Sequence, residues 1–339
     1  SVVAVALKKT ISPHAALEYI GADMGIRGDG EGPFVDLLEA LEQNIDPASV
    51  TGGVTKDKKV PAAHMQDIAE YGPERQWFTP SRYFTRGGQG NIETQRGCNR
   101  KCIYCADPLA KGNRVRYGEP QRVAEEMERL LRLGVHTFHL CDSEFNLKRK
   151  HAEDVCRAIM EKGTEREIAW YTYALPKPMD DDLADLMARA GCRGIDFSVD
   201  AADDDMISRL GRDFQTEDLY KCARACRKAN IVFMFDLLLG GPGETKATMK
   251  KTVREIKRVA PHCTGVSFGV RVFAETRLEK QLRKQGPFSE NPALHGKTEN
   301  NPGLLKPVFY VSEKLGHGPE AYLKKIIDGD PSFFFASRE

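Results

Sequence analysis

The middle of the chain alternates between short apolar runs and longer amphipathic stretches. The short runs are rich in apolar and β-branched residues and predict strands at 92–95, 137–141, 168–173, 194–199, 231–239 and 265–273. The longer stretches carry apolar residues at helical spacing and predict helices at 121–133, 149–162, 181–190, 216–229 and 246–259.

Strands that alternate with helices in this way predict a parallel sheet, because each helix carries the chain back to the start of the next strand. An open doubly wound sheet and a partial barrel both satisfy the pattern. Periodicity alone does not choose between them.

The two ends of the chain have a different pattern. Helices are predicted at 14–20 and 33–43, on either side of a glycine-rich turn. Residues 44–86 are rich in Pro, Gly, Lys and Asp and predict a linker. Beyond the last strand, we expect a strand at 307–312 and a helix at 319–327.

Composition excludes several classes of protein. The 339 residues are 41% hydrophobic and 29% charged, with a net charge of +1, so no strong field favours nucleic acid or a membrane surface. No apolar run reaches the roughly 18 residues that cross a bilayer, and we find no signal peptide. The nine cysteines are not spaced as a disulfide framework. This usage fits a reducing cytosol and predicts a cytoplasmic protein.

Three cysteines lie close together directly after the first predicted strand. Cys98, Cys102 and Cys105 stand where the carboxyl end of a parallel strand commonly places a ligand site. Thiolate is the preferred ligand of iron–sulfur clusters, and three thiolates leave one iron of a cubane open. A structural zinc site would need a fourth ligand, and no second cysteine pair at this spacing occurs. Chance clustering of core cysteines is the other alternative.

This spacing, Cys-x3-Cys-x2-Cys after the first strand of a β/α repeat, resembles the signature of the radical S-adenosylmethionine superfamily. Tyr104, just before the last cysteine, matches as well. The resemblance implies a partial (β/α)6 barrel and a [4Fe–4S] cluster on Cys98, Cys102 and Cys105. It also implies that the open iron binds S-adenosylmethionine, whose one-electron reduction releases a 5′-deoxyadenosyl radical.

Polar and glycine-rich segments at other strand ends resemble the cofactor-binding elements of the same superfamily. The residues that the resemblance assigns to the cofactor are Tyr104, Asp142, Glu144, Ser198, Asp200, Gly240, Gly241, Gly243 and Glu244. Taken alone, the acidic residues equally suit helix N-caps, and the glycine run equally suits an ordinary turn from strand to helix. No residue is assigned a catalytic role.

The N-terminal segment has a second resemblance. Residues 15–41, with the turn Arg27-Gly-Asp-Gly-Glu31, resemble the end of the cobalamin-binding domain that precedes the barrel in one radical subfamily. The resemblance divides the chain into a remnant of that doubly wound domain at 1–45, a linker at 46–88, the barrel at 89–275 and a small substrate or capping extension at 276–339. We expect the chain to be a truncated form of a longer protein that holds cobalamin poorly alone.

The subfamily implies an enzyme that methylates an unactivated carbon of a small molecule, using S-adenosylmethionine and cobalamin. A flavodoxin or a ferredoxin would supply the electron. Three alternatives stay open: a cobalamin-linked oxidative cyclisation, a methylthiotransferase-like enzyme, and a non-catalytic iron–sulfur or zinc protein. Methylthiotransferases carry three further N-terminal cysteines, and none precedes Cys98 here.

Overall fold

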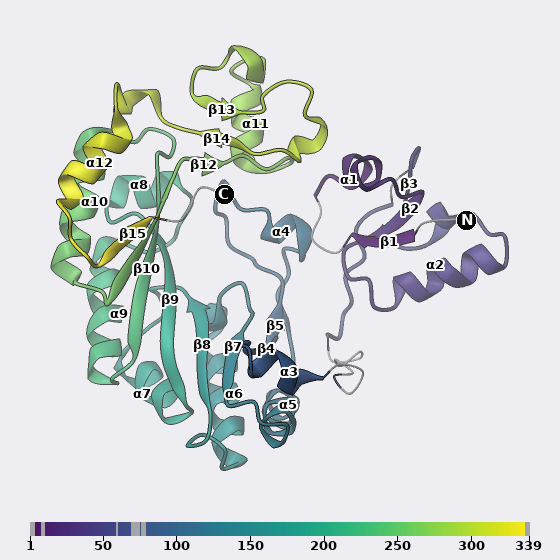
Figure 1. The fold of residues 1–339 in the computed structure, drawn as a ribbon, viewed down its shortest axis with the longest axis horizontal. Coiled ribbons are helices and arrows are strands. Elements are labelled where there is room, and N and C mark those ends of the chain that lie inside the picture. Colours follow the sequence, from purple (N-terminus) through teal and green to yellow (C-terminus); the bar gives the residue numbers. More distant parts are fainter. Residues whose placement is uncertain (1–3, 8–10, 59, 69–74, 76–78, 336–339) are drawn as a thin grey trace. The chain divides into compact units, whose positions relative to one another are not determined.

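The structure is a computed structural model that describes residues 4–7, 11–58, 60–68, 75 and 79–335. The chain divides into two compact units (Figure 1). Unit 1 is formed by residues 1–66, 97–115 and 270–311, and unit 2 by residues 67–96, 116–269 and 312–339.

Unit 2 is built on a seven-stranded sheet. Its strands are β4 (Gly90–Ile92), β7 (Thr137–Leu140), β8 (Ala169–Ala174), β9 (Cys192–Asp200), β10 (Val232–Leu239), β11 (Cys263–Phe268) and β15 (Phe333–Phe335). The order in the sheet is β15-β11-β10-β9-β8-β7-β4, and every neighbouring pair is parallel. The predicted α/β class with a parallel, partial-barrel sheet is therefore confirmed.

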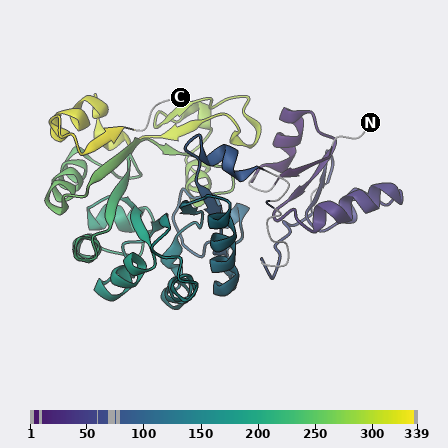
Figure 2. The same ribbon diagram turned by 60° about the horizontal axis from the view of Figure 1, so that its bottom comes forward.

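Helices connect the strands and cover one face of this sheet, as Figures 1 and 2 show. They are α5 (Pro120–Arg132), α6 (Arg149–Glu161), α7 (Asp181–Arg189), α8 (Asp204–Arg209), α9 (Thr216–Lys228), α10 (Lys246–Val259) and α12 (Pro319–Ile327). The five predicted connecting helices and the predicted helix at 319–327 are present. Of the helices of the described residues, none combines the length and apolarity that crossing a bilayer requires.

The strands bury one face and leave the other partly open. In β8, Trp170, Thr172 and Ala174 are buried, whereas Tyr171 and Tyr173 are 38% and 39% exposed. Successive side chains of a strand point to opposite faces of the sheet. One face therefore packs against the helices as the core, and the other face carries partly exposed side chains. Burying the apolar face is the main driving force for the layer of helices.

Three parts of the sheet differ from the prediction. The strand expected at 92–95 is β4, which ends at Ile92, and Gln95–Arg96 form β5 in a separate two-stranded sheet. The strand expected at 265–273 ends at Phe268, because Gly269 turns the chain with φ 89°. The next residues form β12 (Val270–Arg271), which pairs with β14 (Val308–Tyr310) in another sheet. Strand β15 was not predicted, since three consecutive phenylalanines show no alternation.

Unit 1 contains two small sheets. In one, β1 (Ala4–Leu7) lies parallel to β2 (Met24–Arg27), and β2 is antiparallel to β3 (Gly53–Thr55). In the other, β14 lies between β12 and β13 (Leu294–Gly296). The remaining helices of the unit are α1 (Pro13–Ile20), α2 (Pro33–Glu42), α4 (Asp107–Ala110) and α11 (Arg277–Arg283).

The two N-terminal helices and the strand near 307–312 occur where the sequence predicts them. The expected linker at 46–88 contains β3 and a short helix, α3 (Pro80–Phe84), although its residues 59, 69–74 and 76–78 lie outside the described residues. The same holds for residues 1–3 and 8–10 of the expected domain remnant and for 336–339 of the expected C-terminal extension.

Asn146 ties the loop after β7 to the loop after β8. Its side-chain amide donates to the carbonyls of Leu175 at 2.9 Å and Pro178 at 2.7 Å, and its Oδ1 accepts from the Leu175 amide at 2.8 Å. The residue is fully buried. These three bonds use the whole side chain to satisfy backbone groups, which sets the path of both loops.

Replacing Asn146 by alanine should therefore destabilise unit 2. Each buried backbone group left without a partner costs about 1–3 kcal/mol, so we expect Asn146→Ala to lower the free energy of unfolding by about 2–5 kcal/mol. Urea titration followed by circular dichroism measures the change. The exposed Asn91 serves as the control, and Asn91→Ala should change stability by less than about 0.5 kcal/mol. Equal losses in the two variants would contradict the role of Asn146.

Candidate functional site

The three neighbouring cysteines lie on a loop that is closed upon itself. Residues 97–115 connect β5 (Gln95–Arg96) to β6 (Arg116–Tyr117), which pair antiparallel. Within the loop, the Cys98 amide donates to the Gly112 carbonyl at 3.0 Å. Gly97 has φ 98°, and a Cβ there would lie 2.4 Å from the Arg114 carbonyl oxygen. A side chain at position 97 would thus prevent the two ends of the loop from meeting.

The thiols of this loop are largely withdrawn from water. Cys98 is buried, and Cys102 and Cys105 are half-buried. Burial raises the pKa of the Cys105 thiol to about 12, with a smaller contribution from the nearby Asp107 and the other two cysteines. Such thiols ionise only when a cation compensates the charge, which is the situation of a metal ligand.

In the part of the chain that the structure describes, no group of three or more His, Cys, Asp or Glu side chains is set to hold a single metal ion. The loop therefore offers three thiols of suitable chemistry without a closed mononuclear site. An iron–sulfur cluster does not require the thiols to converge on a single ion, because each cysteine ligand binds a different iron.

Two other side chains accompany the loop. Tyr104 is half-buried, and the neighbouring Ile103 carbonyl accepts from the Leu278 amide at 2.8 Å. The His64 ring lies 3.4 Å from where a Cβ of Gly112 would stand. His64 is far from the cysteines in sequence, but the fold of unit 1 places its ring against the cysteine loop.

In unit 2, Arg212 brings together two of the predicted acidic residues. Its Nε lies 3.4 Å from Asp200 Oδ2, its Nη2 lies 4.0 Å from Glu144 Oε1, and it donates to the Ser198 carbonyl. The Arg212, Glu144 and Asp200 side chains are only 5%, 8% and 8% exposed. One cation here offsets the desolvation of two carboxylates.

Arg212 thus brings the side chains of Glu144 and Asp200 together with the backbone of Ser198, while the Ser198 side chain takes no part in these contacts. Asp200 has φ 64°, an uncommon conformation for a residue other than glycine, and it follows a β-bulge in β9. Arg212 itself was missed because it stands in a loop after α8, outside any recognised motif. Its only sequence signal is a cation within a dozen residues of the strand-end acid.

Asp142 faces a different set of partners. Its carboxylate accepts from the Thr94 amide at 2.8 Å, the Thr94 hydroxyl at 2.6 Å and the Gln95 amide at 3.0 Å. Burial raises its pKa to about 6 despite these bonds. Gln95 in turn donates to the Glu144 carbonyl at 2.6 Å. Asp142 therefore fixes the two residues that precede Arg96 and the cysteine loop.

The glycine-rich turn after β10 is organised around Glu244. Gly240 and Gly243 have φ 95° and 84°, which a residue with a side chain rarely adopts. Glu244 Oε2 accepts from the amides of Gly240 and Gly241, the latter at 3.2 Å. The Glu244 side chain is almost fully buried, and this burial raises its pKa to about 7.

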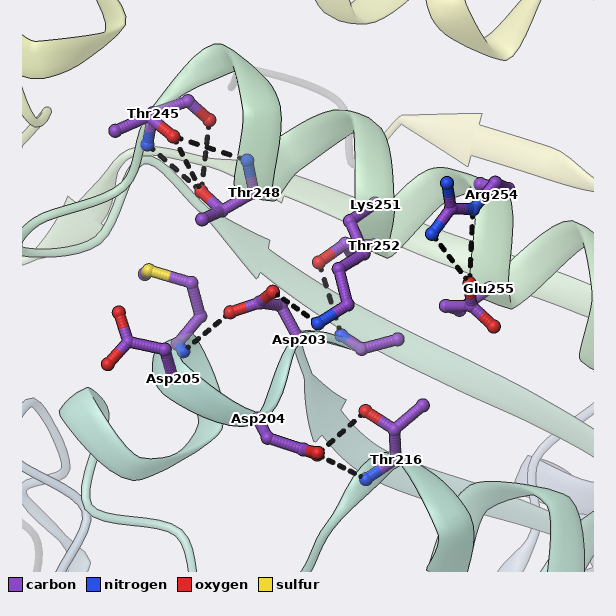
Figure 3. A network of polar contacts seen from close by, with 12 residues as sticks. Asp203, Asp204, Asp205, Thr216, Thr245, Thr248, Lys251, Thr252, Arg254 and Glu255 are labelled. Atoms are coloured by element: carbon purple, nitrogen blue, oxygen red, sulfur yellow. Dashed lines mark hydrogen bonds and ion pairs between the residues drawn. The ribbon is translucent and has the colours of Figure 1, made fainter.

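Helix α10 begins directly after this turn, and Figure 3 shows its first residues. Thr245 accepts from the Thr248 amide at 3.2 Å, a regular N-cap that ends the turn. Lys251, one turn further, pairs with Asp203 at 2.8 Å, and Asp204 accepts from Thr216 (Figure 3). These contacts hold the starts of α8, α9 and α10 in place around the end of the sheet.

A further acidic pair lies on the face of the sheet opposite the helices. Asp196 of β9 and Asp236 of β10 are hydrogen-bonded, and burial is the main cause that raises the pKa of each. The charge of Asp236 raises the pKa of Asp196 further, whereas the hydrogen bond with Asp196 partly offsets the rise at Asp236. The absence of a side chain at Gly265 makes room for Asp236, since a Cβ there would lie 2.1 Å from Asp236 Oδ1. Tyr173 is opposite Asp196 in the β8–β9 register. Sequence analysis did not single out Asp236.

The closed loop gives a first prediction for this site. Gly97→Ala should open the loop, because the new Cβ meets backbone and the positive φ is itself unfavourable by about 1–2 kcal/mol. We expect faster hydrogen exchange at the Cys98 amide and a loss of iron after anaerobic reconstitution. Gly163 also has positive φ, with nothing within 4 Å of where its Cβ would stand, so Gly163→Ala is a control for strain alone. Unchanged exchange in Gly97→Ala would refute the loop closure.

The raised pKa of Glu244 gives a second prediction, which concerns stability against pH. Its pKa is 4.5 unfolded and about 7 folded, so unfolding releases a proton between these values and the wild type loses stability as the pH rises through them. Glu244→Gln keeps an acceptor for the two amides and cannot ionise. From about pH 4 to about pH 8, we expect its free energy of unfolding to gain on the wild type by on the order of 3 kcal/mol.

Urea titrations at several pH values measure this gain. Glu290→Gln, at an exposed position, should run parallel to the wild type over the same range. A constant difference between Glu244→Gln and the wild type would show that Glu244 ionises as readily in the folded chain as in the unfolded one.

Comparisons with known proteins agree with this geometry. Residues 92–256 match the family described as the Radical SAM superfamily. Tryptophan 2-C-methyltransferase of Streptomyces laurentii is 32% identical over 216 residues, which are 60% of this chain and 36% of that protein. Cytidylyl-2-hydroxyethylphosphonate methyltransferase of Streptomyces wedmorensis is 29% identical over 351 residues, covering 89% of this chain and 65% of that protein.

The chain thus spans between 36% and 65% of the length of these two curated relatives. Among solved structures, the radical S-adenosylmethionine methyltransferase TsrM of Kitasatospora setae, with cobalamin and a [4Fe–4S] cluster bound, matches with a TM-score of 0.84 at 27% identity, over 97% of this chain and 73% of that one. The family match covers the strand–helix repeat from β4 into α10, and the TsrM fold extends the likeness over nearly the whole chain. Residues 92–256 thus match the Radical SAM superfamily, and the fold of nearly the whole chain is similar to that of TsrM.

Proposed function

We propose that Cys98, Cys102 and Cys105 hold a [4Fe–4S] cluster with which the protein cleaves S-adenosylmethionine, as part of a cobalamin-dependent methylation of an unactivated carbon. The closed loop that carries three withdrawn thiols is the observation on which this rests. Its thiols are the right donors for iron, and burial raises the pKa of Cys105, so that its thiolate needs a cation nearby. The three-ligand set also leaves one iron free to bind a small molecule.

Unit 2 offers groups that suit the polar parts of S-adenosylmethionine. The cofactor carries an ammonium, a carboxylate and ribose hydroxyls. Glu144 and Asp200 supply acceptors for the ammonium and the hydroxyls, and Arg212 supplies a cation for the carboxylate. The side chains are already desolvated and held by one another, which lowers the cost of ordering them on binding. In this proposal Asp142 acts indirectly, since its oxygens already bind Thr94 and Gln95.

The turn from Gly240 to Glu244 would supply backbone to the flat adenine and to the methionine chain. Two glycines at positive φ allow a ligand to approach the backbone closely, and Tyr104 is kept as a candidate for the same cofactor. When bound, the cluster supplies the single electron that breaks a carbon–sulfur bond of the sulfonium. The residues of the chain hold the cofactor in position and exclude water from it.

Support for methylation comes from the relatives. Both curated relatives above are named methyltransferases, and a second TsrM structure holds tryptophan as substrate with an S-adenosylmethionine analogue. The likeness to TsrM includes unit 1, because it covers 97% of this chain. A small-molecule substrate follows by analogy, and a ferredoxin or flavodoxin would suit the need for one electron.

Unit 1 does not identify a corrin site by itself. Its N-terminal sheet has one parallel strand pair and one antiparallel strand, and the Gly28 turn closes on Ala63, where a Cβ of Gly28 would lie 2.1 Å from a carbonyl oxygen. We therefore assign no residue of this chain to cobalamin and derive no step through it. An oxidative cyclisation that uses the same cofactors is the second candidate for the reaction of this protein.

Anaerobic reconstitution tests the cluster and its chemistry. The wild type should bind about four iron per chain, as expected of a [4Fe–4S] cluster, and cleave S-adenosylmethionine under dithionite. Cys105→Ala should lose most of the iron and all of the cleavage, because a cubane needs its third thiolate. Iron and sulfide analysis, the visible spectrum and chromatography of the nucleoside product are the measurements.

Cys263→Ala is the matched control, since Cys263 is also half-buried and lies on β11. It should keep both iron and cleavage. A wild type that takes up zinc alone, or a Cys105→Ala variant with full iron content, would rule out the proposed cluster.

A further inference from the structure

Ser312 stands where the chain enters unit 2 after β14, and it contacts both ends of the glycine-rich turn. Its amide donates to the Gly240 carbonyl at 2.9 Å, and its hydroxyl donates to the Glu244 carbonyl at 2.9 Å. The residue is 3% exposed. One buried serine thus binds the first and the last residue of the turn.

Other contacts also support the turn. Glu244 binds the Gly240 and Gly241 amides through its side chain, and its own amide donates to the Gly241 carbonyl at 3.0 Å. The Gly269 amide donates to the Leu239 carbonyl at 2.8 Å, at the point where β10 ends. None of these contacts binds the carbonyl of Glu244, which accepts from the hydroxyl of Ser312.

The partners of Ser312 distinguish it from a residue that only stabilises the fold. Its amide and hydroxyl donate to carbonyls of the turn, while its own carbonyl accepts from Leu315 in the short helix that follows. Removing the hydroxyl leaves every strand pair of the sheet intact. The effect should therefore concentrate on the conformation of residues 240–244.

We propose that Ser312 is a positioning residue for S-adenosylmethionine, which holds the Gly240–Glu244 turn in the conformation that the cofactor binds. This inference rests on the proposed function of the turn. A turn without the hydroxyl bond samples other conformations, and binding then pays for ordering it. The loss should appear in cofactor affinity rather than in the rate of the bound complex.

The experiment compares Ser312→Ala with the wild type, both as reconstituted holoenzyme. Loss of one buried hydrogen bond should raise the dissociation constant of S-adenosylmethionine, and its KM in the cleavage reaction, about tenfold. The kcat of cleavage at saturation should stay within about twofold of the wild-type value. The amides of Gly241, Gly243 and Glu244 should exchange faster in the variant. Iron content and circular dichroism should match the wild type, which shows that the chain is folded.

Ser332→Ala is the matched control. Ser332 is half-buried in the same unit and donates to Asp330 at 2.7 Å, away from the turn in its contacts. It should leave the dissociation constant unchanged. The proposal is overturned if Ser312→Ala binds S-adenosylmethionine within twofold of the wild type, or if Ser332→Ala weakens binding equally. A wild type that binds no S-adenosylmethionine would instead defeat the proposed function itself.

Discussion

The burial of one face of the parallel sheet is the constraint on which the rest of unit 2 depends. Each strand turns its apolar side chains toward the helices, as Phe197, Phe233 and Phe235 do on neighbouring strands. Because side chains alternate along each strand, the polar residues then lie on the other face. Because all seven strands are parallel, their carboxyl ends lie at the same end of the sheet, and the loops that follow them start there.

Several carboxyl side chains are buried at this carboxyl end of the sheet, and two kinds of contact stabilise them. Arg212 pairs with Glu144 and Asp200, so one cation offsets the desolvation of both buried side chains. Asp142 and Glu244 are instead surrounded by amide and hydroxyl donors of nearby loops, and burial raises the pKa of each. The first arrangement suits contact with a polar ligand, whereas the second shapes the loops that would surround it.

Local patterns predicted the parts of the structure that depend on local sequence. The helix periods predicted the connecting helices to within a residue or two. The cysteine spacing predicted a ligand site after the first strand, but not the pairing of β5 with β6 from which the loop extends. The pairing of Arg212 with Glu144 joins residues 68 positions apart, and the contact of Ser312 with Glu244 spans the same separation. No periodicity carries such information, because these contacts arise only after the strands have been placed. The break at Gly269 was missed for a related reason, since glycine at the end of an apolar run is compatible with a continuous strand.

The C-terminal extension has more than one role in this arrangement. The sequence suggested a segment for substrate or for capping, yet residues from 312 onward supply β15 to the edge of the sheet and α12 to the layer that contains α10. β15 pairs with β11 through Thr264 and Val266, so it protects the backbone of an edge that would otherwise be open. Ser312 then binds the turn after β10 from the same segment. Residues 312–335 therefore both supply the outer strand of the sheet and hold the turn after β10.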